Sequence, residues 1–171
     1  MSLISYYGNA YQLGYVARDL EKAMDFLRAK MGVEEFVTRD SELMVTVDGR
    51  QQPQSMRVAL ANVGAKQVEV IQPVSGAVGI YIDGVDYDRS AITFHHIGIA
   101  VTGPIAAWTT MEEEVRASGD DFALAFAFDD AGAPQVRYAY VDTRPYCGHY
   151  TEYLWWSPSL QGADGTLPKL S

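Results

Sequence analysis

Four polar side chains of metal-binding types stand inside strand-like, otherwise apolar runs of this chain. They are one amide, one imidazole and two carboxylates: Gln12, His96, Glu69 and Glu152. If they meet in the fold, they make a mixed hard and borderline ligand set that suits Zn²⁺, Ni²⁺, Co²⁺, Mn²⁺ or Fe²⁺. Two carboxylates formally neutralise a divalent ion, so such a site can be buried at a tolerable cost.

The chemistry of such a site follows from its open positions. Four protein ligands on a six-coordinate ion leave two positions, and two neighbouring oxygens of a substrate can occupy them. That arrangement favours enolate or enediolate chemistry, in which the ion acts as a Lewis acid on a carbonyl and a carboxylate removes the proton from the adjacent carbon.

The spacing of these residues indicates an internal duplication. Gln12 and His96 are 84 positions apart. Glu69 follows Gln12 by 57 positions, and Glu152 follows His96 by 56. The two pairs therefore occupy matching places in two copies of one unit.

Two predicted amphipathic helices repeat the same offset. One lies between Asp19, which caps it, and Gly32, which ends it, and the other runs from Pro104 to Ser118 before Gly119. Their apolar residues recur at helical spacing: Leu20, Ala23, Met24, Leu27 and Met31, then Ile105, Trp108, Met111 and Val115. The helices begin near Leu20 and Pro104, again 84 positions apart.

The strand-like runs complete the repeat. YQLGYVA and FHHIGIAV precede the helices, and MRVAL and QVEVI in the first half match VRYAY and YTEYL in the second. The pattern predicts an α+β fold with one unit over 10–73 and another over 93–157. Residues 74–92, rich in Gly and Asp, are predicted to join them as a loop or flap, and 158–171 form a tail.

Composition narrows the partners and the compartment. Apolar residues make up 48% and charged residues 20%, which is typical of a folded globular protein. The net charge of −9 disfavours nucleic acid and anionic membrane surfaces as partners. A single cysteine, Cys147, and the lack of a signal-like or long apolar segment predict a cytoplasmic protein.

The run HHIGIAV, the first strand beginning Gln-Leu-Gly and the helix DLEKAMDFLRAKMGV resemble the vicinal oxygen chelate superfamily. This superfamily includes glyoxalase I, methylmalonyl-CoA epimerase, extradiol dioxygenases and bleomycin resistance proteins. The resemblance covers about residues 10–157 and implies two tandem βαβββ modules whose sheets curl around a central cavity. It also implies one metal ligand from the first and last strand of each module: Gln12, Glu69, His96 and Glu152. Zinc-using glyoxalase I carries the same four residue types.

The function implied by this resemblance is a glyoxalase-like lyase or isomerase that uses a divalent metal ion. Glu152 is the preferred base by analogy with glyoxalase I, and Glu69 is the alternative. The resemblance also implies a small-molecule substrate and a homodimer. Three alternatives stay open: an epimerase-like isomerase, an extradiol dioxygenase and a metal-free binding protein of the bleomycin-resistance type. Epimerases and dioxygenases usually have histidine where Gln12 stands.

Several neighbouring residues have both a functional and a structural interpretation. Arg137, His149 and Trp155 are candidates for substrate binding, but an ion pair, a turn and a core position are the ordinary roles of such residues. Strand alternation predicts that His95 points away from His96 and packs or hydrogen-bonds outside the cavity. Cys147 has no evident partner for thiol catalysis beyond His149.

Overall fold

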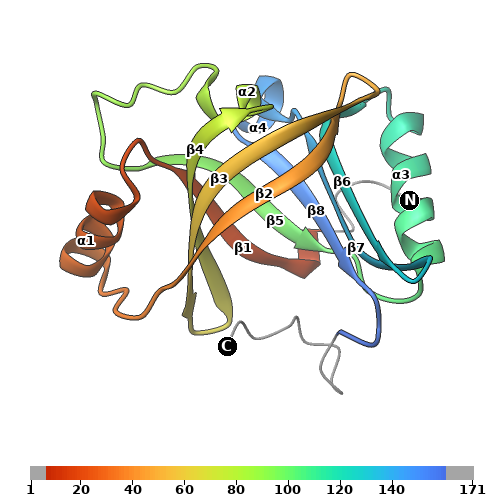
Figure 1. The fold of residues 1–171 in the computed structure, drawn as a ribbon, viewed down its shortest axis with the longest axis horizontal. Helices are drawn as coiled ribbons and strands as arrows, with labels where there is room; N and C mark the ends of the chain where they lie inside the picture. The colour runs from red at the N-terminus through yellow and green to blue at the C-terminus, as the bar shows by residue number, and fades with distance from the viewer. Residues whose placement is uncertain (1–6, 161–171) are drawn as a thin grey trace.

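The strands of the computed structural model, which describes residues 7–160, close into a single eight-stranded barrel (Figure 1). The strands are β1 (Ala10–Val16), β2 (Val37–Val47), β3 (Arg50–Val63), β4 (Lys66–Gly76), β5 (Thr93–Ala100), β6 (Phe122–Asp130), β7 (Ala133–Val141) and β8 (Tyr150–Trp156). The helices are α1 (Leu20–Met31), α2 (Gly79–Ile82), α3 (Ile105–Ala117) and α4 (Arg144–Cys147). The order around the barrel is β1-β4-β3-β2-β6-β7-β8-β5. The predicted fold, α+β with two βαβββ-like modules, is confirmed.

The two long helices begin and end where the sequence predicts. Asp19 caps α1, because its carboxylate accepts a hydrogen bond from the backbone N–H of Lys22 at 3.1 Å. Gly32 ends α1 in the left-handed region, with φ of 66°. α3 follows Pro104 and ends before Ser118. The two helices lie on opposite sides of the barrel (Figure 1).

Strand alternation divides the apolar residues between the outside and the inside of the barrel. On the outside, α1 packs on β3 and β4, and α3 packs on β5, β7 and β8. Inside, a third cluster fills one end of the barrel with residues such as Val16, Val45, Ile71 and Leu124. Each strand sends every second side chain into the barrel. These side chains fill the end occupied by this cluster, and beyond it they line a cavity.

The two modules meet along two unequal seams. β1 and β5 pair antiparallel over six residue pairs, whereas β2 and β6 pair only at Thr46 and Ala125. The β1–β5 pairing skips one residue on each strand, Tyr11 on β1 and His95 on β5. Each skipped residue forms a bulge, which re-aims its side chain relative to simple alternation.

The segment between the modules contains a short helix. β4 extends to Gly76 and β5 begins at Thr93, and α2 lies between them. Tyr81 of α2 is fully buried in the inner cluster, so this part of the predicted loop closes one end of the barrel. Of the predicted tail, residues 161–171 lie outside the described part of the chain.

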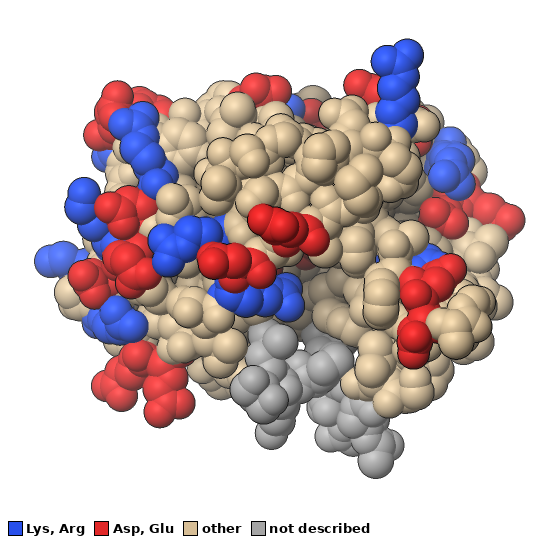
Figure 2. Space-filling view, in the orientation of Figure 1, with Lys and Arg blue, Asp and Glu red and all other residues tan. Residues whose placement is uncertain are grey.

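The surface carries charges of both signs. On the face shown in Figure 2, acidic and basic side chains are interspersed, and no continuous basic patch is visible. Within residues 7–160, the helices are all too short or too polar to cross a bilayer.

Candidate metal centre

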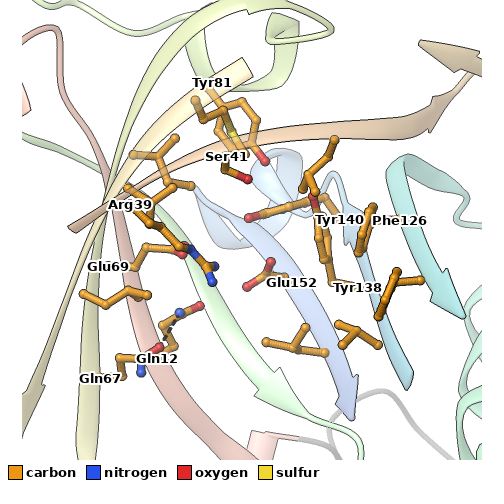
Figure 3. Close-up of a pocket in the computed structure, with 18 of the residues that line it drawn as sticks. Gln12, Arg39, Ser41, Gln67, Glu69, Tyr81, Phe126, Tyr138, Tyr140 and Glu152 are labelled. Carbon is orange, nitrogen blue, oxygen red and sulfur yellow. Dashed lines mark hydrogen bonds between the residues drawn. The ribbon is translucent and has the colours of Figure 1, made fainter. Parts of the chain in front are cut away.

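The four predicted metal ligands meet inside the barrel, beside the β1–β5 seam. His96 Nε2 lies 3.3 Å from Gln12 Oε1, 3.3 Å from Glu69 Oε2 and 3.5 Å from Glu152 Oε2. The metal-binding atoms of Glu69, His96 and Glu152 all lie within 4.8 Å of one another, and all four side chains are buried. Figure 3 shows Gln12, Glu69 and Glu152 directed into the same space from three different strands.

Two glycines make this convergence possible, because each leaves space for the ligand side chain of the strand that it faces. In the β1–β5 pairing Gly14 faces His96 and Gly98 faces Gln12. A Cβ atom on Gly14 would lie 1.8 Å from the His96 ring, and one on Gly98 would lie 2.7 Å from Gln12 Oε1. Both distances are far inside van der Waals contact, so no larger residue fits at either position without displacing the ligand group.

The composition of this cluster fits a divalent cation. Three oxygen acceptors surround one imidazole nitrogen, and a single N–H cannot satisfy three acceptors. Glu152 Oε2 is buried and has no hydrogen-bond partner among the described residues. A buried oxygen without a partner is costly, and a bound cation would satisfy it together with the other donors. Gln12, Glu69, His96 and Glu152 would hold that ion.

The two carboxylates favour a protonated His96. Burial disfavours a charged imidazole, but the carboxylates of Glu152 and Glu69, 3.5 and 3.3 Å from His96 Nε2, outweigh burial and raise the pKa of His96 to about 9. Burial also raises the pKa of Glu152, an effect that His96 partly offsets. The protein thus stabilises positive charge at the point where the carboxylates meet.

Gln67 orients the amide of Gln12. The two residues face each other across the parallel β1–β4 pair, and Gln12 Nε2 donates a hydrogen bond of 2.8 Å to Gln67 Oε1. Since the amide nitrogen is engaged there, the amide oxygen is the atom left facing His96.

His95 does not point away from His96 as strand alternation predicts. The bulge in β5 turns it so that the two Nδ1 atoms lie 2.9 Å apart, while His95 Nε2 lies 3.0 Å from the Ile80 carbonyl oxygen. Its ring stacks on Tyr150, with centroids 4.8 Å apart. His95 is buried behind His96 and does not line the cavity, and burial lowers its pKa to about 3.

The carboxylates open onto a cavity of about 490 Å³, a volume typical of small-molecule sites. One wall is mainly aliphatic and comes from β3 and β4, and the other is aromatic and comes from β6, β7 and β8. The lining side chains include Met56, Val58, Leu60, Ile71, Phe126, Phe128, Tyr138, Tyr140 and Trp156. The cavity reaches the edges of β2 and β6, where these strands barely pair.

Two partly buried tyrosines line this cavity with buried hydroxyl groups that have no hydrogen-bond partner among the described residues. They are Tyr11, which the β1 bulge turns inward, and Tyr138 of β7. Burial, together with the charges of Glu152 and Glu69, raises the pKa of both. Both phenols therefore keep their protons and can donate to the oxygens of a bound ligand.

The structure places the three candidate substrate-binding residues away from the cavity. Arg137 faces outward from β7 and pairs with Asp129. His149 precedes β8, and its Nδ1 lies 2.8 Å from the Tyr150 carbonyl oxygen. Trp155 is buried under α3, and its indole N–H donates to the Gly103 carbonyl at 2.9 Å. None of the three is among the lining residues.

Several residues that line the cavity or support the ligands were not predicted from the sequence. Trp156 lies two strand positions beyond Leu154 and four beyond Glu152, so alternation from Glu152 could have identified it in place of Trp155. Alternation from Glu69 places Gln67 on the same face in the same way. Arg39 was not predicted because the sequence of β2 is polar and does not show the alternating pattern of a strand.

Comparisons with known proteins agree with this architecture. No curated protein matches the chain significantly. Among solved structures, methylmalonyl-CoA epimerase from Mycobacterium tuberculosis is similar, with a TM-score of 0.53, 15% identity and coverage of 89% of this chain and 90% of that one. A Streptomyces coelicolor methylmalonyl-CoA epimerase variant in complex with 2-nitronate-propionyl-CoA has a TM-score of 0.57, 17% identity and coverage of 90% and 97%.

A third similar structure is hypothetical protein BH1468 from Bacillus halodurans, with a TM-score of 0.54, 14% identity and coverage of 90% and 97%. At these identities the likeness shows the fold alone. A family model, in contrast, matches residues 11–140, which is most of the chain. The chain belongs to the Glyoxalase/Bleomycin resistance protein/Dioxygenase superfamily.

Proposed function

We propose that this protein is a metal-dependent lyase or isomerase that moves a proton at a carbon next to a carbonyl group. The observation that carries the proposal is the convergence of Gln12, Glu69, His96 and Glu152 on one buried point at the wall of a small-molecule cavity. Glyoxalase-like and epimerase-like reactions share this proton transfer, so the proposal covers both.

A divalent ion at this point would act as a Lewis acid on two neighbouring oxygens of the substrate. The carbon–hydrogen bond beside the carbonyl then breaks, and its proton passes to a carboxylate of the protein. Delivery of a proton to the opposite face of the same carbon by the second carboxylate gives an epimer, whereas return of the first proton to the neighbouring carbon gives a rearranged product.

Glu152 is the proposed base, with Glu69 as the alternative. Both carboxylates line the cavity, but Glu152 has a buried oxygen without a hydrogen-bond partner in the described structure. Its raised pKa brings the carboxyl group closer to neutral pH, where a group can both accept and return a proton. Tyr11 and Tyr138 are proposed to donate hydrogen bonds to substrate oxygens and so to hold the carbonyl in place.

The proposal is supported over the dioxygenase alternative by residue types. An extradiol dioxygenase needs two histidines and one carboxylate around Fe²⁺, and Gln12 stands where one histidine is needed. The similar structures named as methylmalonyl-CoA epimerases make acyl thioesters reasonable first substrates. A homodimer stays a prediction.

The test is deuterium exchange. The protein is loaded in turn with Ni²⁺, Co²⁺, Zn²⁺, Mn²⁺ or Fe²⁺ and incubated in D₂O with thiohemiacetals, α-hydroxythioesters and acyl-CoAs. NMR then reports deuterium at the carbon beside the carbonyl. We expect metal-dependent exchange that falls by about 10²–10⁴-fold in Glu152→Gln. Glu113→Gln, on the exposed face of α3, is the matched control and should exchange like the wild type.

Metal analysis of the same samples separates binding from catalysis. A protein that binds no divalent ion, or whose metal content is unchanged by both His96→Ala and Glu152→Gln, would contradict the site. Exchange that survives Glu152→Gln but is lost in Glu69→Gln would transfer the role of base to Glu69. Oxygen consumption with catechols, and no proton exchange, would favour the dioxygenase.

A further inference from the structure

Arg39 is the single lysine or arginine among the described residues that line the cavity. It lies on β2 directly opposite Val58 of β3, and residues paired across two strands share a face. Val58 is buried inside the barrel, so the side chain of Arg39 also leaves β2 on the inner face of the barrel. Figure 3 shows its guanidinium group extending toward the space between Gln12 and Glu152.

The side chain of Arg39 has no ion pair or hydrogen bond with any other described residue. The arginine on the neighbouring strand behaves differently. Arg57 faces outward and pairs with Glu21 at 3.2 Å and with Asp40 at 3.5 Å. Arg39 is exposed at the mouth of the cavity, so its five donors are free to bind an anionic ligand that enters there.

Resting on the proposed function, we infer that the substrate is an amphipathic acid whose anionic oxygen group binds Arg39. Its two metal-binding oxygens lie next to Glu69 and Glu152. Much of the remaining cavity wall is apolar, with Val58 and Leu60 on one side and Phe126 on the other. The substrate therefore also carries a hydrocarbon or aromatic part that packs on these side chains.

Hydroxamic acids provide the probe, because a hydroxamate offers two neighbouring oxygens to a metal. A series of hydroxamic acids of increasing length carries a carboxylate at the far end, and each has a matched methyl ester. Calorimetry measures their binding to the metal-loaded protein. At the best length we expect the acid to bind about tenfold more tightly than its ester. Arg39→Met should abolish this preference, and Arg57→Met should keep it.

The outcomes separate the inference from the function on which it rests. Equal binding of acid and ester at every length, with clear hydroxamate binding, overturns the role of Arg39 and leaves the proposed function intact. A preference that survives in Arg39→Met has the same meaning. If no hydroxamate binds the metal-loaded protein, the proposed function fails and the inference fails with it.

A different observation concerns the tautomer of His96. The Ile80 carbonyl, 3.0 Å from His95 Nε2, can only accept a hydrogen bond, so His95 Nε2 carries a proton. The ring is buried and its neighbours there are aromatic rings, which favours its neutral form with a bare Nδ1. The 2.9 Å contact between the two Nδ1 atoms then requires His96 Nδ1 to be the donor.

The geometry points to His95 as a positioning residue that holds His96 in its Nδ1–H tautomer. In that form the neutral ring presents its Nε2 lone pair to the cluster of Gln12, Glu69 and Glu152. Metal-binding histidines are commonly oriented through their second nitrogen, and loss of such a partner typically costs 10–100-fold in affinity. Here the partner is the preceding residue of the same strand, which only the bulge brings into place.

The test uses metal affinity and NMR, independent of turnover. His95→Phe keeps a ring beside Tyr150 but removes the acceptor, and we expect metal affinity to fall about 10–100-fold. His95→Asn places an amide oxygen near the Nδ1 position and should recover most of that loss. His149→Phe, at a nearby histidine outside the cavity, is the control and should bind metal like the wild type.

Nitrogen-15 NMR of the metal-loaded wild type supplies a readout that needs no variant. The His96 signals should show a protonated Nδ1 and a metal-coordinated Nε2. A protonated Nε2, or wild-type metal affinity in folded His95→Phe, would overturn the positioning role.

Discussion

The two seams between the modules differ in their strand pairing and in the part of the site that they form. The β1–β5 seam has six residue pairs, two bulges and the glycines that face Gln12 and His96. The β2–β6 seam has one pair, and the cavity reaches both of its edges. The β1–β5 seam, here called the paired seam, brings Gln12 Oε1 to 3.3 Å from His96 Nε2. At the β2–β6 seam, here called the open seam, the two strands part beside the cavity.

This difference shows how a duplicated chain can build one asymmetric site. The strands at the paired seam have little freedom, because backbone hydrogen bonds and close glycine contacts specify their register. The strands at the open seam are free to carry different side chains. β2 presents Arg39 and Ser41 to the cavity, whereas β6 presents Phe126 and Phe128. We expect metal binding to depend on the paired seam and substrate choice on the open one.

The largest expected effect comes from the two equivalent ligand positions of the paired seam. His96→Ala should lower metal affinity on the order of a thousandfold, since the strongest single donor is lost. Gln12→Ala should lower it about tenfold, because a neutral amide oxygen is a weaker ligand. Competition with a chelator of known affinity measures both. Equal losses would show that the two modules contribute equally at this seam.

The glycines give the next largest effect. Gly14→Ala places a methyl group on the His96 ring, and overpacking of this kind costs about 1–3 kcal/mol of stability. Metal affinity should also fall about a hundredfold, because the ring must move. Gly98→Ala should do less, since its methyl group would lie 2.7 Å from Gln12, whereas that of Gly14→Ala would lie 1.8 Å from the His96 ring. Denaturant unfolding and metal titration report the two effects. Wild-type values for Gly14→Ala would refute the close packing of the seam.

Metal affinity should depend on pH through His96. With its pKa raised to about 9 in the metal-free protein, the ring is protonated at neutral pH and must lose that proton to bind an ion. Affinity should therefore rise by up to about tenfold per pH unit and level off near pH 9. Calorimetry in buffers of different ionisation enthalpy should detect about one proton released per ion. Binding without proton release would contradict a charged His96.

The smallest expected effect lies at the open seam. Phe126→Leu removes an aromatic ring that stacks on Tyr138 with centroids 4.9 Å apart. The preference of the metal-loaded protein for benzohydroxamate over acetohydroxamate should fall several-fold, in keeping with the energy of one aromatic contact. Metal affinity should not change. Phe122→Leu, on the outward side toward α3, is the control. Loss of metal affinity in Phe126→Leu would show that the two seams are not independent.

Local signals in the sequence account for much of the fold. Asp19 and Gly32 bound α1, and apolar spacing marks both long helices. The 84-residue offset identifies the two modules and pairs Gln12 with His96. The alternation of each strand also indicates which neighbours share a face with a ligand, as it does for Trp156 and Glu152. These features follow from the chain because each depends on residues close together in sequence.

Tertiary structure decided the features that depend on how strands pair. The bulges at Tyr11 and His95 arise from the register between β1 and β5, and strand periodicity alone points His95 the wrong way. Arg39 is inward because β2 pairs with β3 opposite Val58. The residue types and their spacing therefore determined which groups could form the site. Contacts between distant strands decided which of them face one another, because side-chain direction in a barrel is set jointly by both partners of each pair.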